Sequence, residues 1–181
     1  EDMERVRRLR SECQAILVGA GTIVADDPHL TVKGLPPERQ PLRVILDPRG
    51  KVPETAMVLD ARARTLVVTV RECERTYPGA ETVRLGTGRI DLEALLALLG
   101  ARGVSTLLVE GGGETIYSFF RAGLVDVYSV FIGDFIIGGR EAPTPVDGEG
   151  FRTGEHISLR LVSVERLGAG VHLTYEVVRD A

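Results

Sequence analysis

The chain has 181 residues, which favours one domain, because a single hydrophobic core typically serves about 100–200 residues. Hydrophobic residues make up 44% and charged residues 27%, which excludes a disordered linker, a coiled coil and a collagen-like chain. The net charge of −4 gives no broad cationic surface, so we expect no nucleic-acid partner.

Cysteines, histidines and apolar runs exclude several further classes. Cys13 and Cys73 stand far apart and form neither a disulfide framework nor a CxxC metal motif. The three histidines lack metal-ligand spacing, so no metal site is expected. No run approaches the roughly 18 apolar residues that cross a bilayer, and the first residues lack a signal-peptide pattern. We therefore predict a cytoplasmic protein with neither a metal nor a membrane partner.

Helix and strand patterns alternate along the first two thirds of the chain. Apolar residues at helical spacing, together with capping residues, predict helices over residues 1–13, from the turn after residue 19 to Asp26, from Asp91 to Gly100 and over residues 115–122. Short runs of β-branched residues and leucine predict strands at residues 15–18, 42–46, 65–70 and 106–109, and a short strand near a sheet edge at residues 82–85.

The last third is β-rich. A long strand is predicted at residues 127–137, and residues 157–166 and 171–179 form a hairpin pattern around Gly168-Ala169-Gly170. The fold class predicted is therefore α/β: a mixed, mostly parallel sheet flanked by helices, with a C-terminal antiparallel hairpin, in a single domain.

Three polar or glycine-rich segments follow predicted strands, at residues 19–27, 47–51 and 110–115. Ligands of open α/β sheets gather beyond the carboxyl ends of the strands, so we expect these segments to line one crevice.

The segment Glu110-Gly111-Gly112-Gly113-Glu114 carries the clearest signal. Three consecutive glycines between a strand and a helix let a ligand approach the backbone, and they direct N–H groups and the helix dipole at an anion such as a pyrophosphate. A tight turn alone needs fewer glycines. Glu110 suits hydrogen bonds from a ligand's NH or OH groups, but a solvated surface glutamate fits its position equally well.

Gly19-Ala20-Gly21 begins like the dinucleotide-binding fingerprint G-x-G-x-x-G. Val24 occupies the third glycine position, so that motif is excluded. Thr22 and Asp26 suit hydrogen bonds to sugar or amide groups of a ligand. Asp26 equally suits the end of a helix, and the residues alone leave both readings open.

Asp47-Pro48-Arg49 follows the second predicted strand. A carboxylate there suits ribose hydroxyls, and Arg49 suits the 2′-phosphate that distinguishes NADPH. A surface type I turn is the alternative.

The sequence contains no G-x-S-x-G elbow, no Cys/His couple and no P-loop, so no catalytic residue is assigned. Hydride transfer is compatible with that pattern, because the cofactor then carries the chemistry and the protein mainly orients the reactants.

Three segments together resemble the riboflavin-biosynthesis reductases. They are VGAGTIVADDPHLTV at residues 18–32, LVEGGG at 108–113 with AGLVD at 122–126, and IGGREAPT at 137–144 with VDGEGF at 146–151. This family comprises the reductase half of the bacterial bifunctional deaminase–reductase and its stand-alone archaeal and fungal relatives. The third segment is most similar to the archaeal branch.

The resemblance implies a dihydrofolate-reductase-like fold and an NADPH-dependent reduction, with NADH as a possible substitute. For the archaeal branch the phosphorylated substrate is 2,5-diamino-6-(ribosylamino)-4(3H)-pyrimidinone 5′-phosphate, whose ribosyl chain becomes ribityl. With Asp47 from the reading above, the cofactor-binding residues expected are Thr22, Asp26, Asp47, Pro48, Arg49, Gly111, Gly112, Gly113 and Glu114. The substrate-binding residues implied are Leu30, Lys33 and Glu110.

The sequence departs from the family at its start. Family members begin with a central strand that ends in a Ser-x-Asp-Gly-Lys-like segment just before the first helix, and residues 1–181 contain no such strand. We therefore expect a single reductase domain over residues 1–181 that lacks its N-terminal strand: either that strand precedes Glu1, or the chain is a truncated copy that is not a competent enzyme.

Three alternatives remain open at this stage. One is reduction of the deaminated 5-amino-6-(5-phosphoribosylamino)uracil, another is reduction of a different pterin or pyrimidine, and the third is a non-catalytic ligand-binding or oligomer-scaffold domain. The strand predicted at residues 127–137 is apolar on both faces, which favours a homodimer, with an internal core strand as the alternative.

Overall fold

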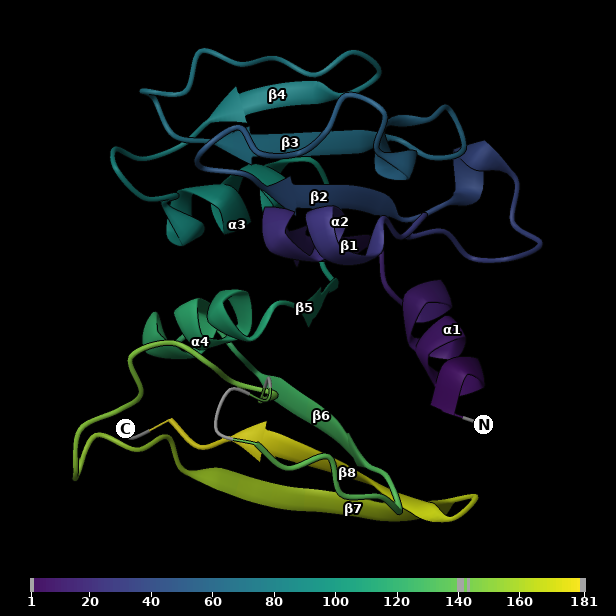
Figure 1. The fold of residues 1–181 in the computed structure, drawn as a ribbon, viewed down its shortest axis with the longest axis vertical. Coiled ribbons are helices and arrows are strands. Elements are labelled where there is room, and N and C mark those ends of the chain that lie inside the picture. The colour runs from purple at the N-terminus through teal and green to yellow at the C-terminus, as the bar shows by residue number, and fades with distance from the viewer. Residues whose placement is uncertain (1, 140–141, 143, 180–181) are drawn as a thin grey trace.

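The computed structural model describes residues 2–139, 142 and 144–179 and contains two separate sheets (Figure 1). The larger sheet has five parallel strands in the order β4-β3-β2-β1-β5. Its strands are β1 (Ala15–Gly19), β2 (Leu42–Leu46), β3 (Thr65–Thr69), β4 (Glu81–Arg84) and β5 (Leu107–Gly111).

The central strands of this sheet are buried on both faces. Every residue of β1 and β3 is buried, which is why their sequences are unbroken apolar and β-branched runs. On one face Ile16, Val18 and Ile45 pack beneath α2 (Ala20–Asp26). On the other face the residues of opposite parity form a second core with α3 (Leu92–Ala101) and α4 (Gly113–Arg121). Single-turn 3-10 helices cover residues Pro37–Arg39 and Met57–Leu59.

The smaller sheet is antiparallel, in the order β6-β8-β7. Its strands are β6 (Val127–Ile132), β7 (Leu159–Leu167) and β8 (Gly170–Val177). Cross-strand partners share a face, so Tyr128, Tyr175 and Leu161 lie in one row. Phe120 of α4 packs edge-on against Tyr128 at 5.4 Å between ring centroids.

Two features differ from the sequence prediction. The strand predicted at residues 127–137 ends at Ile132, because Gly133 and Asp134, both poor strand formers, follow it directly. The antiparallel strands also form a sheet of their own: among the described residues, β5 and β6 each have one edge with no strand partner.

The N-terminal helix α1 (Asp2–Glu12) contacts both sheets. Arg5 forms an ion pair with Glu165 of β7 at 2.6 Å, and Arg10 forms one with Glu110 of β5 at 2.5 Å. Charged residues of α1 therefore link two sheets that share no strand pairing. In the part of the chain that is described, no helix is long and apolar enough to cross a membrane.

Candidate functional site

Two turns meet at the carboxyl edge of the larger sheet, because β1 and β5 are adjacent parallel strands. A Cβ at Gly19 would lie 2.6 Å from Thr115 Oγ1, so only glycine allows the turn after β1 to pack this closely against α4. Thr22 Oγ1 lies 3.7 Å and 3.6 Å from the Cβ positions that Gly111 and Gly112 would have. The structure thus places the predicted residues Thr22, Gly111 and Gly112 in one group.

The glycine turn leaves backbone accessible at the start of α4. Gly112 has φ 69°, a left-handed conformation that favours glycine, and α4 begins at the next residue. The first N–H groups of a helix have no partner within it. Gly111 and Gly112 therefore offer a surface free of side chains beside N–H donors and the positive end of a helix dipole, which suits a phosphate.

Glu110 is held inside the site and is not a solvated surface residue. The register between β1 and β5 shifts after Leu17, which leaves Glu110 in a bulge of β5. A bulge redirects a side chain, and here both carboxylate oxygens accept hydrogen bonds from Arg10, Oε1 from Nε at 2.6 Å and Oε2 from Nη2 at 2.5 Å. The Glu110 side chain is only 13% exposed. Its carboxylate is fixed by a two-point contact that leaves lone pairs for a ligand donor.

Arg10 is a residue that the sequence did not single out. Its partner is 100 positions away, and no local pattern links the two. Its position one turn after Val6, on the half-buried side of α1, was the available signal.

Asp147 is a second residue that the sequence did not single out. It lies so close to the start of α4 that a Cβ at Gly113 would clash with its carboxylate. Its Oδ1 accepts hydrogen bonds from the hydroxyl and backbone N–H of Thr144, and these bonds lower the pKa of Asp147. A negative charge therefore stands at Gly113, so only Gly111 and Gly112 of the three glycines remain suited to an anion. Arg140, Glu141 and Pro143 of the third family-like segment lie outside the described residues.

The turn after β2 is organised by Asp47, which is fully buried. Its carboxylate accepts hydrogen bonds from the backbone N–H groups of Lys51 and Val52, both at 2.8 Å, and from the hydroxyl of Tyr77 at 2.5 Å. Burial, together with the bond to Asp47, raises the pKa of Tyr77. Asp47 thus shapes the turn from inside, while Arg49 is exposed on it.

The last residue of α2 and the segment after it carry three of the predicted site residues. Asp26 and Lys33 are exposed, but Leu30 is only 2% exposed and belongs to the core. Leu30 has φ 50°, which L residues rarely adopt.

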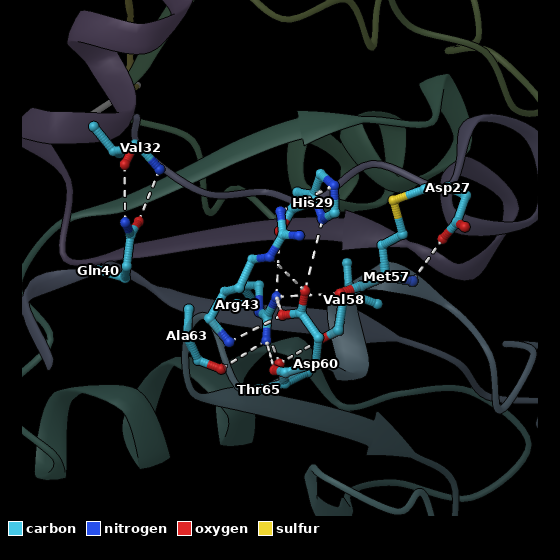
Figure 2. Close-up of polar contacts among 11 residues, drawn as sticks. Asp27, His29, Val32, Gln40, Arg43, Met57, Val58, Asp60, Ala63 and Thr65 are labelled. Atoms are coloured by element: carbon cyan, nitrogen blue, oxygen red, sulfur yellow. Dashed lines mark hydrogen bonds and ion pairs between the residues drawn. The ribbon is translucent and has the colours of Figure 1, made fainter. Parts of the chain in front are cut away.

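Beneath this segment lies a polar network around Arg43, shown in Figure 2. Burial tends to raise the pKa of its Asp60 carboxyl. The hydrogen bonds from the Arg43 guanidinium and the Arg62 backbone outweigh burial, so this pKa is lowered and Asp60 stays ionised.

Not every predicted residue joins the glycine-turn group. Among the described residues, no hydrogen bond links Lys33 or Arg49 to the glycine turn. A hollow of about 640 Å³ lies at the opposite, amino edge of the sheet, lined by residues such as Gln14, Arg64 and Arg102 and by none of the predicted site residues. In the described part of the chain, no group of three or more His, Cys, Asp or Glu could hold a metal ion.

Comparison with known proteins places the chain in a family. The family described as the RibD C-terminal domain matches residues 1–173. The chain belongs to this family. Relatives of this RibD C-terminal domain protein include the 2,5-diamino-6-ribosylamino-4(3H)-pyrimidinone 5′-phosphate reductases of Archaeoglobus fulgidus, 43% identical over 96% of this chain and 84% of the relative, and of Methanothermobacter thermautotrophicus, 40% identical over 98% and 86%.

Solved structures agree with the family. A deaminase/5-amino-6-(5-phosphoribosylamino)uracil reductase from Thermotoga maritima superposes with a TM-score of 0.79 at 28% identity, covering 97% of this chain and 48% of that one. Against this bifunctional protein, the chain thus spans about half the length. A riboflavin biosynthesis reductase from Saccharomyces cerevisiae shares the fold, with a TM-score of 0.79 at 20% identity, covering 98% of this chain and 81% of that one. The predicted family and fold class are confirmed.

Proposed function

We propose that this protein uses NADPH to reduce the ribosyl side chain of 2,5-diamino-6-(ribosylamino)-4(3H)-pyrimidinone 5′-phosphate to the ribityl chain, in riboflavin biosynthesis. The observation that carries the proposal is the identity of 43% and 40% to archaeal reductases of that name over nearly the whole chain. The arrangement of Glu110 and the glycine turn at one sheet edge is the local support.

The residues present fit a nicotinamide dinucleotide. Gly111 and Gly112 offer side-chain-free backbone beside Thr22 Oγ1 for the phosphates, and a bulkier residue would close that approach. Arg49 is exposed beside the turn that Asp47 fixes, where it suits a 2′-phosphate and hence NADPH over NADH. When bound, the cofactor supplies the hydride that reduces C1′ of the ring-opened ribosylamine.

The protein's own residues bind and orient the substrate. Lys33 is exposed and suits the 5′-phosphate. Glu110, fixed by Arg10, accepts a hydrogen bond from an amino group or a sugar hydroxyl of the substrate. Holding donor and acceptor in a near-attack arrangement away from water is the main contribution expected of the protein. No residue is assigned as the proton donor.

Three further expectations belong to this proposal. The unpaired edges of β5 and β6 support a domain that includes one more strand, outside residues 1–181, pairing with both. The exposed apolar side chains Ile132, Leu161 and Val164 on one face of the smaller sheet support a homodimer. A cytoplasmic location stays a prediction.

The proposal is tested by following the nicotinamide absorbance of NADPH in the presence of the protein within its full-length chain. The diamino-pyrimidinone phosphate should be reduced faster than the deaminated uracil, and NADPH should be used better than NADH. Faster turnover of the uracil would favour the alternative substrate. Absence of turnover with both would overturn the proposal in favour of a binding or scaffold domain.

A further inference from the structure

Arg43 on β2 is a charged side chain with no exposed surface. Burying a guanidinium is unfavourable unless its donors are all paired. Nε donates to Thr65 Oγ1 at 2.9 Å, and Nη1 donates to Asp60 Oδ1 at 2.9 Å. The remaining acceptors are backbone carbonyl oxygens, those of His29 at 3.3 Å, Met57 at 3.4 Å, Asp60 at 2.6 Å and Ala63 at 2.6 Å. Arg43 therefore ties two loops to the sheet through their main chains (Figure 2).

One of these loops is the segment at residues 27–33, which leads from α2 through Leu30 to Lys33. Asp27 has φ 41° and Leu30 has φ 50°, and neither is glycine. Such conformations persist only where the surroundings impose them. The carbonyl that Arg43 holds belongs to His29, between these two residues. Asp27 Oδ1 in turn accepts the backbone N–H of Met57 at 2.8 Å, which joins the two loops directly.

Gln40 holds the other end of the same segment. Its Oε1 accepts the N–H of Val32 at 2.7 Å, while its Nε2 donates to the carbonyls of Val32 at 2.8 Å and Leu35 at 2.7 Å. One side chain thus pairs with both backbone groups of Val32, as a neighbouring strand would. The segment is fixed before Leu30 by Arg43 and after it by Gln40.

Core packing alone does not require this arrangement, because an apolar side chain fills buried space at a lower desolvation cost than a guanidinium. What Arg43 provides is a set of donors for the carbonyls of two irregular loops. We propose that Arg43 and Gln40 are positioning residues for the reduction, holding the backbone of residues 27–33, and with it the exposed side chain of Lys33, in the geometry that binds the phosphorylated substrate. This inference rests on the proposed function, which places the substrate at that segment.

The test compares Gln40→Ala and Arg43→Lys with Arg102→Met, which removes an arginine that pairs with Glu81 and whose side chain, among the described residues, donates no hydrogen bond to residues 27–33. Lysine keeps the charge of Arg43 but supplies only three donors. We expect KM for the pyrimidine phosphate to rise at least about tenfold in the first two variants, because small displacements of binding groups cost that much. KM for NADPH should stay within about threefold of wild type, and R102M should change neither. All assays are run well below each variant's melting temperature.

Amide hydrogen exchange provides a second measurement that needs no substrate. In the wild type the amide of Val32 should be protected, and in Q40A and R43K exchange across residues 27–33 should be faster while the amides of β1 remain protected. Q40A alters only the end of the segment, so it keeps the test informative where R43K does not fold. Faster exchange in Q40A with an unchanged substrate KM overturns the positioning role. Absence of turnover in the wild type counts against the proposed function. Unchanged exchange in Q40A would show that the hydrogen bonds of Gln40 do not fix the segment.

Discussion

Both carboxylate oxygens of Glu110 accept hydrogen bonds from the guanidinium of Arg10. This two-point contact determines the expected effect of substituting Glu110. Glu110→Gln keeps the shape but removes the charge, so it weakens both the contact with Arg10 and the hydrogen bond offered to the substrate. We predict that substrate affinity falls about 10- to 100-fold, the range of a charged hydrogen bond, and that NADPH affinity falls less. Titration calorimetry with each ligand measures both.

A matched control is Glu81→Gln, which breaks a surface pair with Arg102 and should leave both affinities unchanged. Equal losses of substrate and NADPH affinity in E110Q would reject a substrate-specific role.

Tyr77 makes stability sensitive to alkaline pH. Its pKa is raised in the folded protein, whereas in the unfolded chain it has the ordinary value of about 10. Above that pH the unfolded state loses a proton that the folded state retains, so the free energy of unfolding falls as pH rises. We predict that Tyr77→Phe is less stable at about pH 8, by about 1–3 kcal/mol, because Asp47 loses a donor.

The same variant should also lose less stability between about pH 8 and about pH 11 than the wild type does. Urea unfolding at both pH values measures the two slopes. Identical slopes would show that ionisation of Tyr77 is not coupled to folding.

Three of these residues show which features of the candidate site the sequence predicts and which it does not. The position of Glu110 at a strand end followed from local pattern, but its bulge and its partner Arg10 depend on the pairing of distant segments. Asp47 was expected at the sheet edge and is there, yet its carboxylate turns inward to meet Tyr77, 30 positions away. Leu30 lies in the predicted segment, but the residue is only 2% exposed and packs in the core. The sequence therefore located these residues at strand ends and loops. Contacts with distant segments determine which of their atoms are buried or paired.

At the scale of elements, α3 begins where its capping residue predicts. The side chain of Asp91 accepts a hydrogen bond from the backbone N–H of Ala94 at 2.9 Å. We predict that Asp91→Ala lowers stability by about 1 kcal/mol, the usual worth of an N-cap. Thermal unfolding should show a melting temperature lower by about 2–4 °C. Asp134→Ala, outside any helix, should shift it by less, and equal shifts would mean that the cap is not the cause.

Elements with local signals were predicted and those that depend on context were not. The buried strands β1, β2 and β3 stand out because both faces are apolar, and the α3 pattern carries its own cap. Residues 135–137 have the same apolar character, yet Ile136 is 97% exposed and outside any strand. Hydropathy does not reveal whether a neighbouring strand is present to pair with a segment.

At the scale of the whole molecule, the smaller sheet has two unlike faces. Register places Val130, Leu173 and Val164 in a second apolar row beside the row of Tyr128, Tyr175 and Leu161. The opposite face carries polar partners such as Arg160 with Glu176. Within the described chain, α4 reaches the apolar face through Phe120, but Leu161 and Val164 remain 51% and 59% exposed.

A second copy of the chain covering this apolar face would remove those side chains from water, which is the main force in stable homodimers. We predict a dimer by light scattering. Leu161→Asp should weaken it at least about a hundredfold, because an unpaired carboxylate would be buried in an apolar interface. Ser163→Asp, on the opposite face of the same strand, should leave the dimer intact. A monomeric wild type, or a dimer that L161D and S163D weaken equally, would mean that this face is not the interface.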